Sequence, residues 1–404
     1  MRGGRLIERF FDAAYIQRWN DLIRPLDFTE LDKQAHKIII AFVIAKHEEQ
    51  DRGIELKWDE IVHGCFFEFL QRIILTDIKP AVFDKIMEDK GKELNEWVLK
   101  NWEKDLNEFK SGLYEDFKAY LINPPSSNTE RRILKAAHYL STSWEFNIIY
   151  HTNPGIYGIK KTKEEIENRL EDYFDFIGVQ KISLKKKSFD FIDLCGQLRF
   201  QKRWIQTPRI PQTSVLGHTL IVALITYLCS REKGLSGERL SNNFFGALFH
   251  DLPEALTRDI ISPIKKAVGG LEDIIGDYEK NLVKEKMLPL LPQQWHAEMR
   301  FFLEEPFKNR VMSEDGKVKI VDNEKMNDIL ENDPAYPLRI DGEVIEACDH
   351  LAAFLEAAIS IKHGVSSRHL EEGKKKLAEN YKGKVINGLN FGELFGYFLQ
   401  DDLL

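Results

Sequence analysis

The stretch FFGALFHDLPEALTRDIISPIKK, residues 244–266, decides how the rest of the chain is interpreted. Its apolar start is followed by an adjacent His and Asp, His250 and Asp251. Glu254 lies three residues after the Asp. On a helix these side chains would fall within about 100° of one face. An imidazole and two carboxylates converging in this way suit a divalent metal, a bound water and a nearby proton acceptor.

Pro253 interrupts this pattern, because proline lacks an N–H and clashes with the preceding turn of a helix. We expect a kink or a helix restart at this point, with Asp251 and Glu254 in the spacing of a capping box. The plain alternative is a buried His beside an N-cap Asp. The stretch alone therefore does not establish a metal site.

Length and composition bound the class of protein. The chain has 404 residues, which favours two or three domains, and it is 43% hydrophobic and 30% charged, as in an ordinary globular protein with a sizeable core. The net charge of −8 argues against a general nucleic-acid binder, which usually carries a basic excess. A small-molecule partner is the expectation that remains.

The cysteines and the N-terminus point to the cytoplasm. The four cysteines are scattered and form no CxxC pair, so we expect reduced thiols; they are Cys65, Cys195, Cys229 and Cys348. No apolar run is expected to reach membrane-spanning length, and the charged N-terminus lacks the apolar centre of an export signal. We therefore expect a cytoplasmic protein without a membrane partner.

Helical periodicity dominates the sequence and predicts an all-α fold. The runs 38–45 and 220–228 are apolar throughout and predict buried helices, while 60–75, 92–113 and 128–150 predict amphipathic ones. The clear β signal is RVMSEDGKVKIV, in which the pair Asp315-Gly316 is typical of a tight turn. We expect a small hairpin inserted at about 309–342.

The two halves of the chain echo each other, which predicts a tandem duplication with domains at 1–182 and 190–404. Arg18-Trp19 recurs as Arg203-Trp204, and His36 precedes an apolar run as His218 does, at an offset of 218 − 36 = 182. The same offset places Glu68 opposite His250, Phe69 opposite Asp251 and Asp77 opposite Asp259, and His138 matches Asp349 in a later motif. Only the second copy keeps a complete ligand set, so the first copy is predicted to be degenerate. Whether His36, Glu68 and His138 bind anything stays open.

The ordered set His218, His250-Asp251 and Asp349, in helical context, resembles the HD-domain superfamily of metal-dependent phosphohydrolases. The surrounding residues are similar to its bacterial 5′-deoxynucleotidase branch, in which an Arg-Trp precedes the first His and a Glu and an Asp follow the HD pair. Here these are Arg203-Trp204, Glu254 and Asp259, and the resemblance covers about 192–363.

The resemblance implies a role for each of these residues. His218, His250, Asp251 and Asp349 would ligate one divalent cation, and two imidazoles with two carboxylates suit Mn²⁺, Co²⁺, Fe²⁺ or Zn²⁺ better than Ca²⁺. Glu254, with Asp251, would act in catalysis by moving protons to or from water and the leaving group. The residues expected to bind the substrate are Arg203 at the phosphate and Trp204 with Asp259 at the sugar.

The expected activity is removal of the 5′-phosphate from (deoxy)nucleoside monophosphates, by a metal-activated water in the second domain. Two other HD chemistries stay open: a triphosphohydrolase acting on dNTPs and an alarmone hydrolase. A third alternative is a nucleotide sensor that binds without turnover. The resemblance also allows a homodimer.

Overall fold

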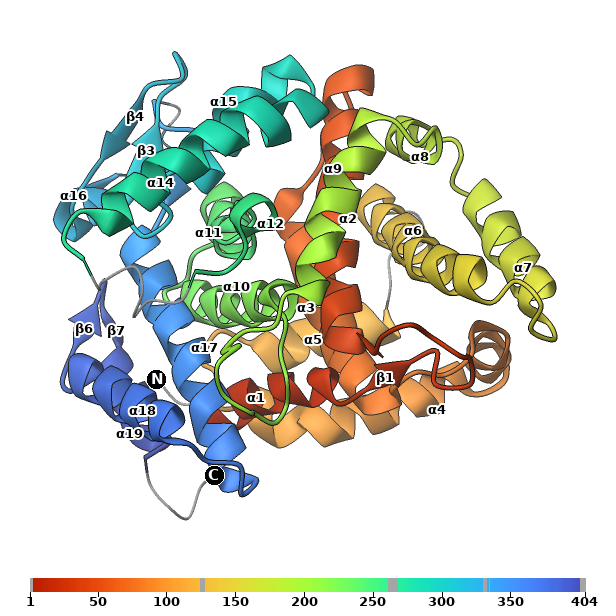
Figure 1. The fold of residues 1–404 in the computed structure, drawn as a ribbon, viewed down its shortest axis with the longest axis horizontal. Helices are drawn as coiled ribbons and strands as arrows, with labels where there is room; N and C mark the ends of the chain where they lie inside the picture. Colours follow the sequence, from red (N-terminus) through yellow and green to blue (C-terminus); the bar gives the residue numbers. More distant parts are fainter. Residues whose placement is uncertain (1–2, 124–127, 261–267, 330–332, 334, 400–404) are drawn as a thin grey trace. The chain divides into compact units, whose positions relative to one another are not determined.

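The structure is a computed structural model that describes residues 3–123, 128–260, 268–329, 333 and 335–399. The chain divides into two compact units, Arg2–Leu184 and Lys185–Leu404, called here the N-terminal and C-terminal units (Figure 1). Both are mostly helical, with small antiparallel sheets. The predicted helical class is therefore confirmed, with strands beyond the predicted hairpin.

The N-terminal unit is built around the long helix α2, Glu30–Arg52, most of which is buried. Helix α6, Thr129–Thr152, packs along α2 and also contacts α3, Trp58–Leu75. The remaining elements are α1 Gly4–Arg9, η1 Phe10–Ala14, β1 Gln17–Arg18, β2 Phe28–Thr29, α4 Pro80–Leu106, α5 Leu113–Ile122, α7 Ile159–Glu171 and α8 Ile177–Ser183.

The C-terminal unit is built around α10, Val215–Glu232, which packs against α11, Gly237–Phe249, and α17, Gly342–Lys362 (Figure 1). The other helices are α9 Lys187–Gly196, η2 Gln197–Phe200, α12 Glu254–Thr257, α14 Leu271–Leu282, η3 Val283–Met287, η4 Leu288–Leu290, η5 Gln293–Trp295, α15 His296–Leu303, α16 Asn323–Asp328, α18 Arg368–Tyr381 and α19 Phe391–Tyr397. The strands are β3 Arg310–Met312, β4 Val318–Ile320, β5 Leu338–Ile340, β6 Val385–Ile386 and β7 Leu389–Asn390.

Local sequence explains where the central helices begin. The Thr29 hydroxyl accepts from the Asp32 N–H at the start of α2, and the Ser214 hydroxyl accepts from the Gly217 N–H at the start of α10. Among the described residues, α10 alone has the length and apolar composition of a membrane span. The sequence-based expectation was that no apolar run reaches this length. The side chains of α10 are buried against α11 and α17, as in a core helix.

The predicted hairpin is confirmed, and a third strand joins it. Strands β3 and β4 pair antiparallel across the Asp315-Gly316 turn, where Gly316 adopts a φ of 77°, and β5 pairs with the other edge of β3. The insertion ends at Asp341, whose carboxylate accepts both Nε and Nη2 of Arg239 and the Asn243 amide of α11. This buried network fixes the start of α17 against α11.

The helix restart near Pro253 is confirmed, but its capping is not the one expected. Helix α11 ends at Phe249 and α12 begins at Glu254, with Pro253 as its N-cap and no side-chain cap. The Glu254 N–H donates to the main-chain oxygen of Asp251 instead of to its carboxylate. The Asp251 side chain is thereby left for the site described next.

Candidate metal centre

Two core helices of the C-terminal unit bring together residues far apart in the sequence. His218 lies in the first turn of α10 and is wholly buried, and Asp349 lies in the second turn of α17. Their side chains meet directly, with 2.7 Å between His218 Nε2 and Asp349 Oδ1. The tight packing of α10 on α17 therefore creates one half of the candidate site.

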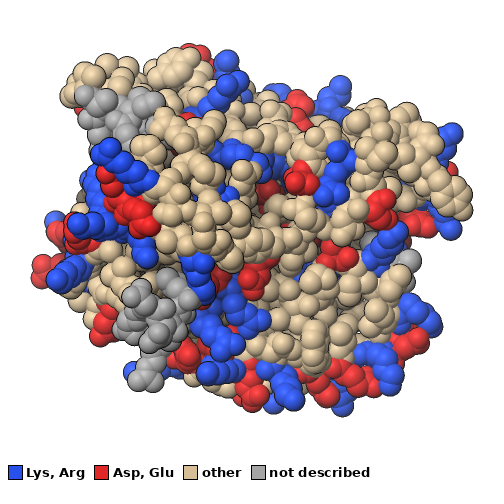
Figure 2. Space-filling view, turned by 60° about the horizontal axis from the view of Figure 1, so that its bottom comes forward, with Lys and Arg blue, Asp and Glu red and all other residues tan. Residues whose placement is uncertain are grey.

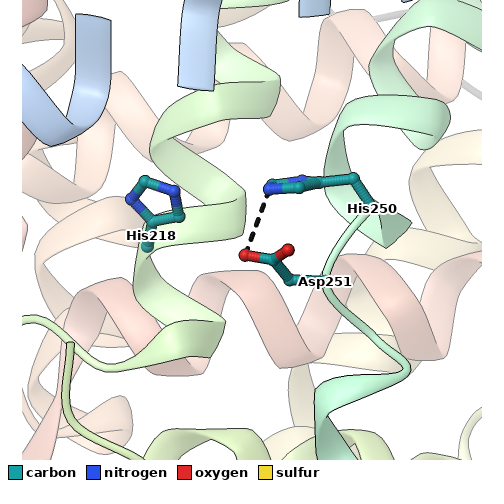
Figure 3. A group of neighbouring side chains, drawn as sticks. All are labelled: His218, His250 and Asp251. Carbon is teal, nitrogen blue, oxygen red and sulfur yellow. Dashed lines mark ion pairs between the residues drawn. The ribbon is translucent and has the colours of Figure 1, made fainter. Parts of the chain in front are cut away.

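The end of α11 supplies the other half. His250 follows the last residue of α11 and Asp251 follows it in the turn, so the helix break directs both side chains toward α10 (Figure 3). His250 Nε2 lies 3.2 Å from Asp251 Oδ2 and 3.9 Å from Asp349 Oδ1. One ligand atom from each of His218, His250 and Asp251 lies within 4.8 Å of the others, which is close enough for one ion.

A hydrogen bond to its far nitrogen directs the His250 imidazole into the site. His250 Nδ1 lies 2.6 Å from the main-chain oxygen of Ala247, which can only accept, so Nδ1 carries the proton. The Nε2 atom of His250 is then the one able to bind a metal. In His218, Nε2 lies 2.7 Å from Asp349 Oδ1, and Nδ1 faces Glu356 Oε1 at 3.4 Å.

Glu356 is the functional residue that the sequence reasoning missed. It is wholly buried and accepts from the Trp204 indole at 2.9 Å and from the Thr213 hydroxyl, in addition to facing His218. Its signal in the sequence is its spacing, because it follows Asp349 by seven residues and so lies on the same face of α17 two turns later. Glu356 thus joins the candidate ligands to the Arg203-Trp204 motif.

The carboxylates of the site are charged, and they raise the pKa of the imidazole beside them. Burial and Arg203 both lower the pKa of His218, but Glu356 and Asp349 outweigh them and raise it to about 9. Burial raises the pKa of Asp251, but His250 and Arg203 outweigh it and lower the value to about 2. His218 lowers the pKa of Asp349, and Arg209 together with His218 lowers the pKa of Glu356. In both residues this outweighs the effect of burial. All three carboxylates are therefore ionised at neutral pH.

Arg203 and Trp204 lie beside the candidate ligands. The Arg203 guanidinium is 3.7 Å from Asp251 Oδ2 and 3.9 Å from Glu356 Oε2. Trp204 adopts the left-handed conformation, with a φ of 56°, and its ring lies against Gly373 of α18, where a Cβ atom would come within 2.9 Å of the indole. The structure thus places this motif at the site, as the sequence predicts.

Glu254 and Asp259 are less closely tied to the site by direct contacts. Glu254 is buried at the start of α12, one turn beyond Asp251, and its main-chain oxygen accepts from Gln201. The Asp259 N–H donates to the side chain of the same Gln201, and the Asp259 carboxylate helps to raise the pKa of Arg203. The roles assigned to Glu254 and Asp259 stay predictions.

Comparison with known proteins identifies the segment that carries these residues. Residues 195–378 match the HD domain family. The match contains every candidate ligand, together with Arg203, Trp204 and Glu356. The matched segment also contains the adjacent pair His250-Asp251.

An enzyme and a solved structure are similar to this part of the chain. A 4′-phosphooxetanocin A phosphatase from Priestia megaterium is 24% identical over 176 residues, which is 43% of this chain and 74% of the relative. The crystal structure of an HD-domain phosphohydrolase from Listeria innocua is 17% identical, with a TM-score of 0.37, covering 53% of this chain and 86% of that one.

The donor set of this HD domain fits a divalent transition metal. His218, His250 and Asp251 lie close enough for one ion, and Asp349 Oδ1 lies 2.7 Å from His218 Nε2 and 3.9 Å from His250 Nε2. First-row metals bind such mixed nitrogen and oxygen ligands well. Each imidazole lies beside one of these carboxylates, His218 beside Asp349 and His250 beside Asp251. The residues that would hold the ion are His218, His250, Asp251 and Asp349.

The face drawn in Figure 2 carries both signs of charge. On the face drawn in Figure 2, Lys and Arg side chains alternate with Asp and Glu side chains. A nucleic-acid interface would instead gather positive charge along one face. The absence of a nucleic-acid partner stays a prediction.

Proposed function

We propose that the C-terminal unit is a metal-dependent phosphomonoesterase that removes the 5′-phosphate from (deoxy)nucleoside monophosphates. The observation that carries this proposal is the convergence of His218, His250, Asp251 and Asp349 beside an Arg-Trp motif. A divalent cation held there supplies Lewis-acid activation of water and of the phosphoryl group. The proposed partner is a small-molecule nucleotide, and the proposed location of the protein is the cytoplasm.

The protein's own residues hold the phosphate and move the protons. Arg203 is planar and permanently charged, and it lies within 4 Å of Asp251, so its fork can bind phosphate oxygens next to the ligand cluster. Glu254 lies one turn beyond Asp251 and is the group that accepts the proton of the attacking water or returns it to the leaving oxygen. Glu356 holds both His218 and Trp204 in place during the reaction.

The substrate class follows from the residues around the phosphate site. The Trp204 ring is fixed by Glu356 and Gly373 and offers a flat surface at the sugar. Asp259 adds a carboxylate able to accept from a sugar hydroxyl. The Priestia megaterium relative is named as a phosphatase of a phosphorylated compound, which supports a phosphomonoester in preference to a polyphosphate substrate.

The experiment is a phosphate-release assay on purified protein with Mn²⁺, Co²⁺, Fe²⁺ or Zn²⁺ added separately. The substrates are the (deoxy)nucleoside 5′-monophosphates, with dNTPs and guanosine tetraphosphate for comparison. We expect inorganic phosphate and nucleoside as products, and loss of at least about 100-fold in His250→Ala and Asp251→Ala. Lys375→Ala, on the exposed face of α18, serves as the matched control.

Other products would identify a different chemistry. Tripolyphosphate would indicate a triphosphohydrolase, and pyrophosphate would indicate an alarmone hydrolase. Tight nucleotide binding without turnover under all four metals would indicate a sensor. Equal activity in His250→Ala, Asp251→Ala and the parent would remove the proposal altogether.

The architecture forms part of the same proposal. We infer that the N-terminal unit is a second, degenerate HD-like copy, because both units build a capped central helix after an Arg-Trp motif. The domains are proposed at 1–182 and 190–404. A homodimer is compatible with this arrangement and is tested by the mass of the purified protein in solution.

A further inference from the structure

An aromatic side chain from the loop before the hairpin lies against the candidate metal centre. The Phe307 ring lies 5.7 Å from the His250 ring, centroid to centroid, at an interplanar angle of 49°. Phe307 belongs to the connection between α15 and β3, residues 304–309, called here the Phe307 loop. The fold therefore brings a ring from this loop to a residue that would bind the metal.

Both the site and this ring can be reached from solvent. The side-chain exposures are 18% for Asp251, 17% for Asp349 and 17% for Arg203. Phe307 is also partly exposed, although Phe302 in the last turn of α15 is buried. Phe307 thus combines contact with a candidate ligand and a surface that another molecule can touch.

One buried guanidinium holds the main chain on both sides of Phe307. Arg310, the first residue of β3, is 1% exposed and donates five hydrogen bonds to main-chain oxygens, at 2.8–3.3 Å. The acceptors belong to Phe301, Phe302, Glu305, Pro306 and Lys308. Burial lowers the pKa of Arg310 to about 10, so the charge is kept here at a cost in solvation. The immediate neighbours of Phe307 are therefore fixed by a cation that has little contact with water.

The Phe307 loop is also attached to the helices that bring ligands into the site. The Glu343 N–H, in the first turn of α17, donates to the side-chain oxygen of Asn309 at 3.1 Å. Ile340 of β5 packs on α11 at Gly246, where a Cβ atom would lie 3.1 Å from Ile340 Cδ1. Strand β3, which follows the loop, pairs with β5. These attachments set the place of the Phe307 ring relative to α11 and α17.

A fixed ring at this place suits the flat end of a nucleotide. His250 is already oriented by its contact with the Ala247 oxygen, so it does not need Phe307 for its direction. An aromatic ring held before binding loses little freedom when a ligand packs on it. Phe307 is one ring away from the metal position, which is within the span of a nucleoside whose phosphate lies at the metal.

We propose that Phe307 is a specificity-determining residue of the C-terminal unit, against which the nucleobase of the substrate packs. This inference rests on the proposed function, because it needs a phosphate held at the metal and at Arg203. Trp204 and Phe307 border different ligands, since Trp204 donates to the glutamate that faces His218, while Phe307 contacts His250. The Phe307 loop, fixed by Arg310, thereby extends the site toward the base.

The test compares two kinds of ligand that differ by the base alone. Equilibrium dialysis with Mn²⁺ measures the binding of the four deoxynucleoside 5′-monophosphates and of 2-deoxyribose 5-phosphate. The full-length protein carries Glu254→Gln, which removes the proposed proton transfer and slows turnover. In this background Phe307→Ala should weaken the binding of at least one nucleotide by about 10- to 100-fold, as loss of base stacking does. The binding of 2-deoxyribose 5-phosphate should change by less than about 2-fold.

Further variants separate contact with the base from a general disturbance. Phe307→Tyr keeps the ring and should stay within about 3-fold of the parent. Phe174→Ala, the same substitution at an exposed ring of the N-terminal unit, should leave both ligands unaffected. Arg310→Lys removes the planar fork, so the nucleotide should again be weakened more than 2-deoxyribose 5-phosphate. The metal content, measured by elemental analysis, should be equal in all of these proteins.

Each outcome bears on either the inference or the proposed function. Equal weakening of both ligands, or loss of metal in Phe307→Ala, would show that the ring acts through His250 and would overturn the inference. Unchanged nucleotide binding in Phe307→Ala would overturn it as well, as would a parent that binds no nucleotide. A wild-type protein that binds nucleotide through Phe307 but releases no phosphate with any metal would contradict the proposed catalysis alone.

Discussion

At the scale of single residues, the candidate metal centre depends on a carboxylate that touches no substrate. Glu356 faces His218 Nδ1 and accepts from Trp204, so it sets the direction of a metal-binding imidazole and of the proposed substrate platform. Substituting Glu356→Gln keeps the shape but removes the charge. We expect metal affinity to fall about 10- to 100-fold, as for other partners that orient metal ligands.

Competition with a chromophoric chelator measures this effect. Activity in Glu356→Gln should recover when the metal concentration is raised, because the ligands themselves remain. Glu343→Gln, in the first turn of the same helix α17, is the matched control. Unchanged affinity in Glu356→Gln would show that Glu356 does not position His218.

The sequence could predict the four candidate ligands because their residue types and order are distinctive. It could not show that His218 and Asp349 meet at 2.7 Å, since 131 residues separate them in the chain. The contact of Glu356 with the candidate site was not predicted, for a different reason. A glutamate on a helix is most often a solvated residue, and only the packing of α17 on α10 reveals that this one is buried.

At the scale of elements, the insertion before α17 is tied to α11 by Asp341. Burial raises the pKa of Asp341, but the Arg239 guanidinium and the Asn243 amide outweigh it and lower the value. A lowered pKa contributes stability above the unfolded value of about 3.9, and this is lost as the pH falls through the folded value. Asp341→Asn should therefore cost about 3–5 kcal/mol of unfolding free energy at pH 7.

Urea unfolding at a series of pH values measures the difference between Asp341→Asn and the parent. The difference should begin to shrink below about pH 4, where the unfolded carboxylate takes up a proton, and it should vanish once the pH has fallen through the lower folded value. Glu324→Gln, an exposed substitution on α16 in the same insertion, should stay near the parent throughout. A pH-independent difference would show that the charge of Asp341 is not the source of the stability.

Helix α18 fixes the Trp204 ring through a residue without a side chain. At Gly373 a Cβ atom would lie 2.9 Å from the indole, so Gly373→Leu should displace the ring. We expect kcat/KM for nucleotide to fall by about 10-fold or more, with metal content unchanged, because Trp204 contacts no candidate ligand other than through Glu356. Steady-state kinetics with Lys375→Ala as control measures this, and an unchanged kcat/KM would remove Trp204 from the substrate site.

The elements themselves were largely predictable from hydrophobic periodicity and turn residues. The buried helices and the Asp315-Gly316 hairpin appear where expected. The third strand β5 was not predicted, because its three residues carry too short a pattern. The capping of α12 was also wrong, since a proline N-cap leaves Asp251 turned into the site.

At the scale of the whole molecule, the sequence predicts a duplication but does not determine its register, and the duplication stays a proposal. The apolar runs of α2 and α10 align almost equally well after a shift of three residues, because such a shift is close to one helical turn. The helix caps and the φ of 56° that Trp19 and Trp204 share remove this ambiguity and place Lys33 opposite His218. The proposed duplication, with a complete ligand set in the C-terminal unit, predicts one metal ion per chain.

The most direct test of the metal centre is an anomalous difference map from crystals grown with Mn²⁺. The predicted result is one strong peak per chain, about 2.0–2.3 Å from Nε2 of His218 and His250 and from carboxylate oxygens of Asp251 and Asp349. The N-terminal unit should show no peak near Lys33. A map without density among these four side chains, or with its ion held elsewhere, would contradict the account.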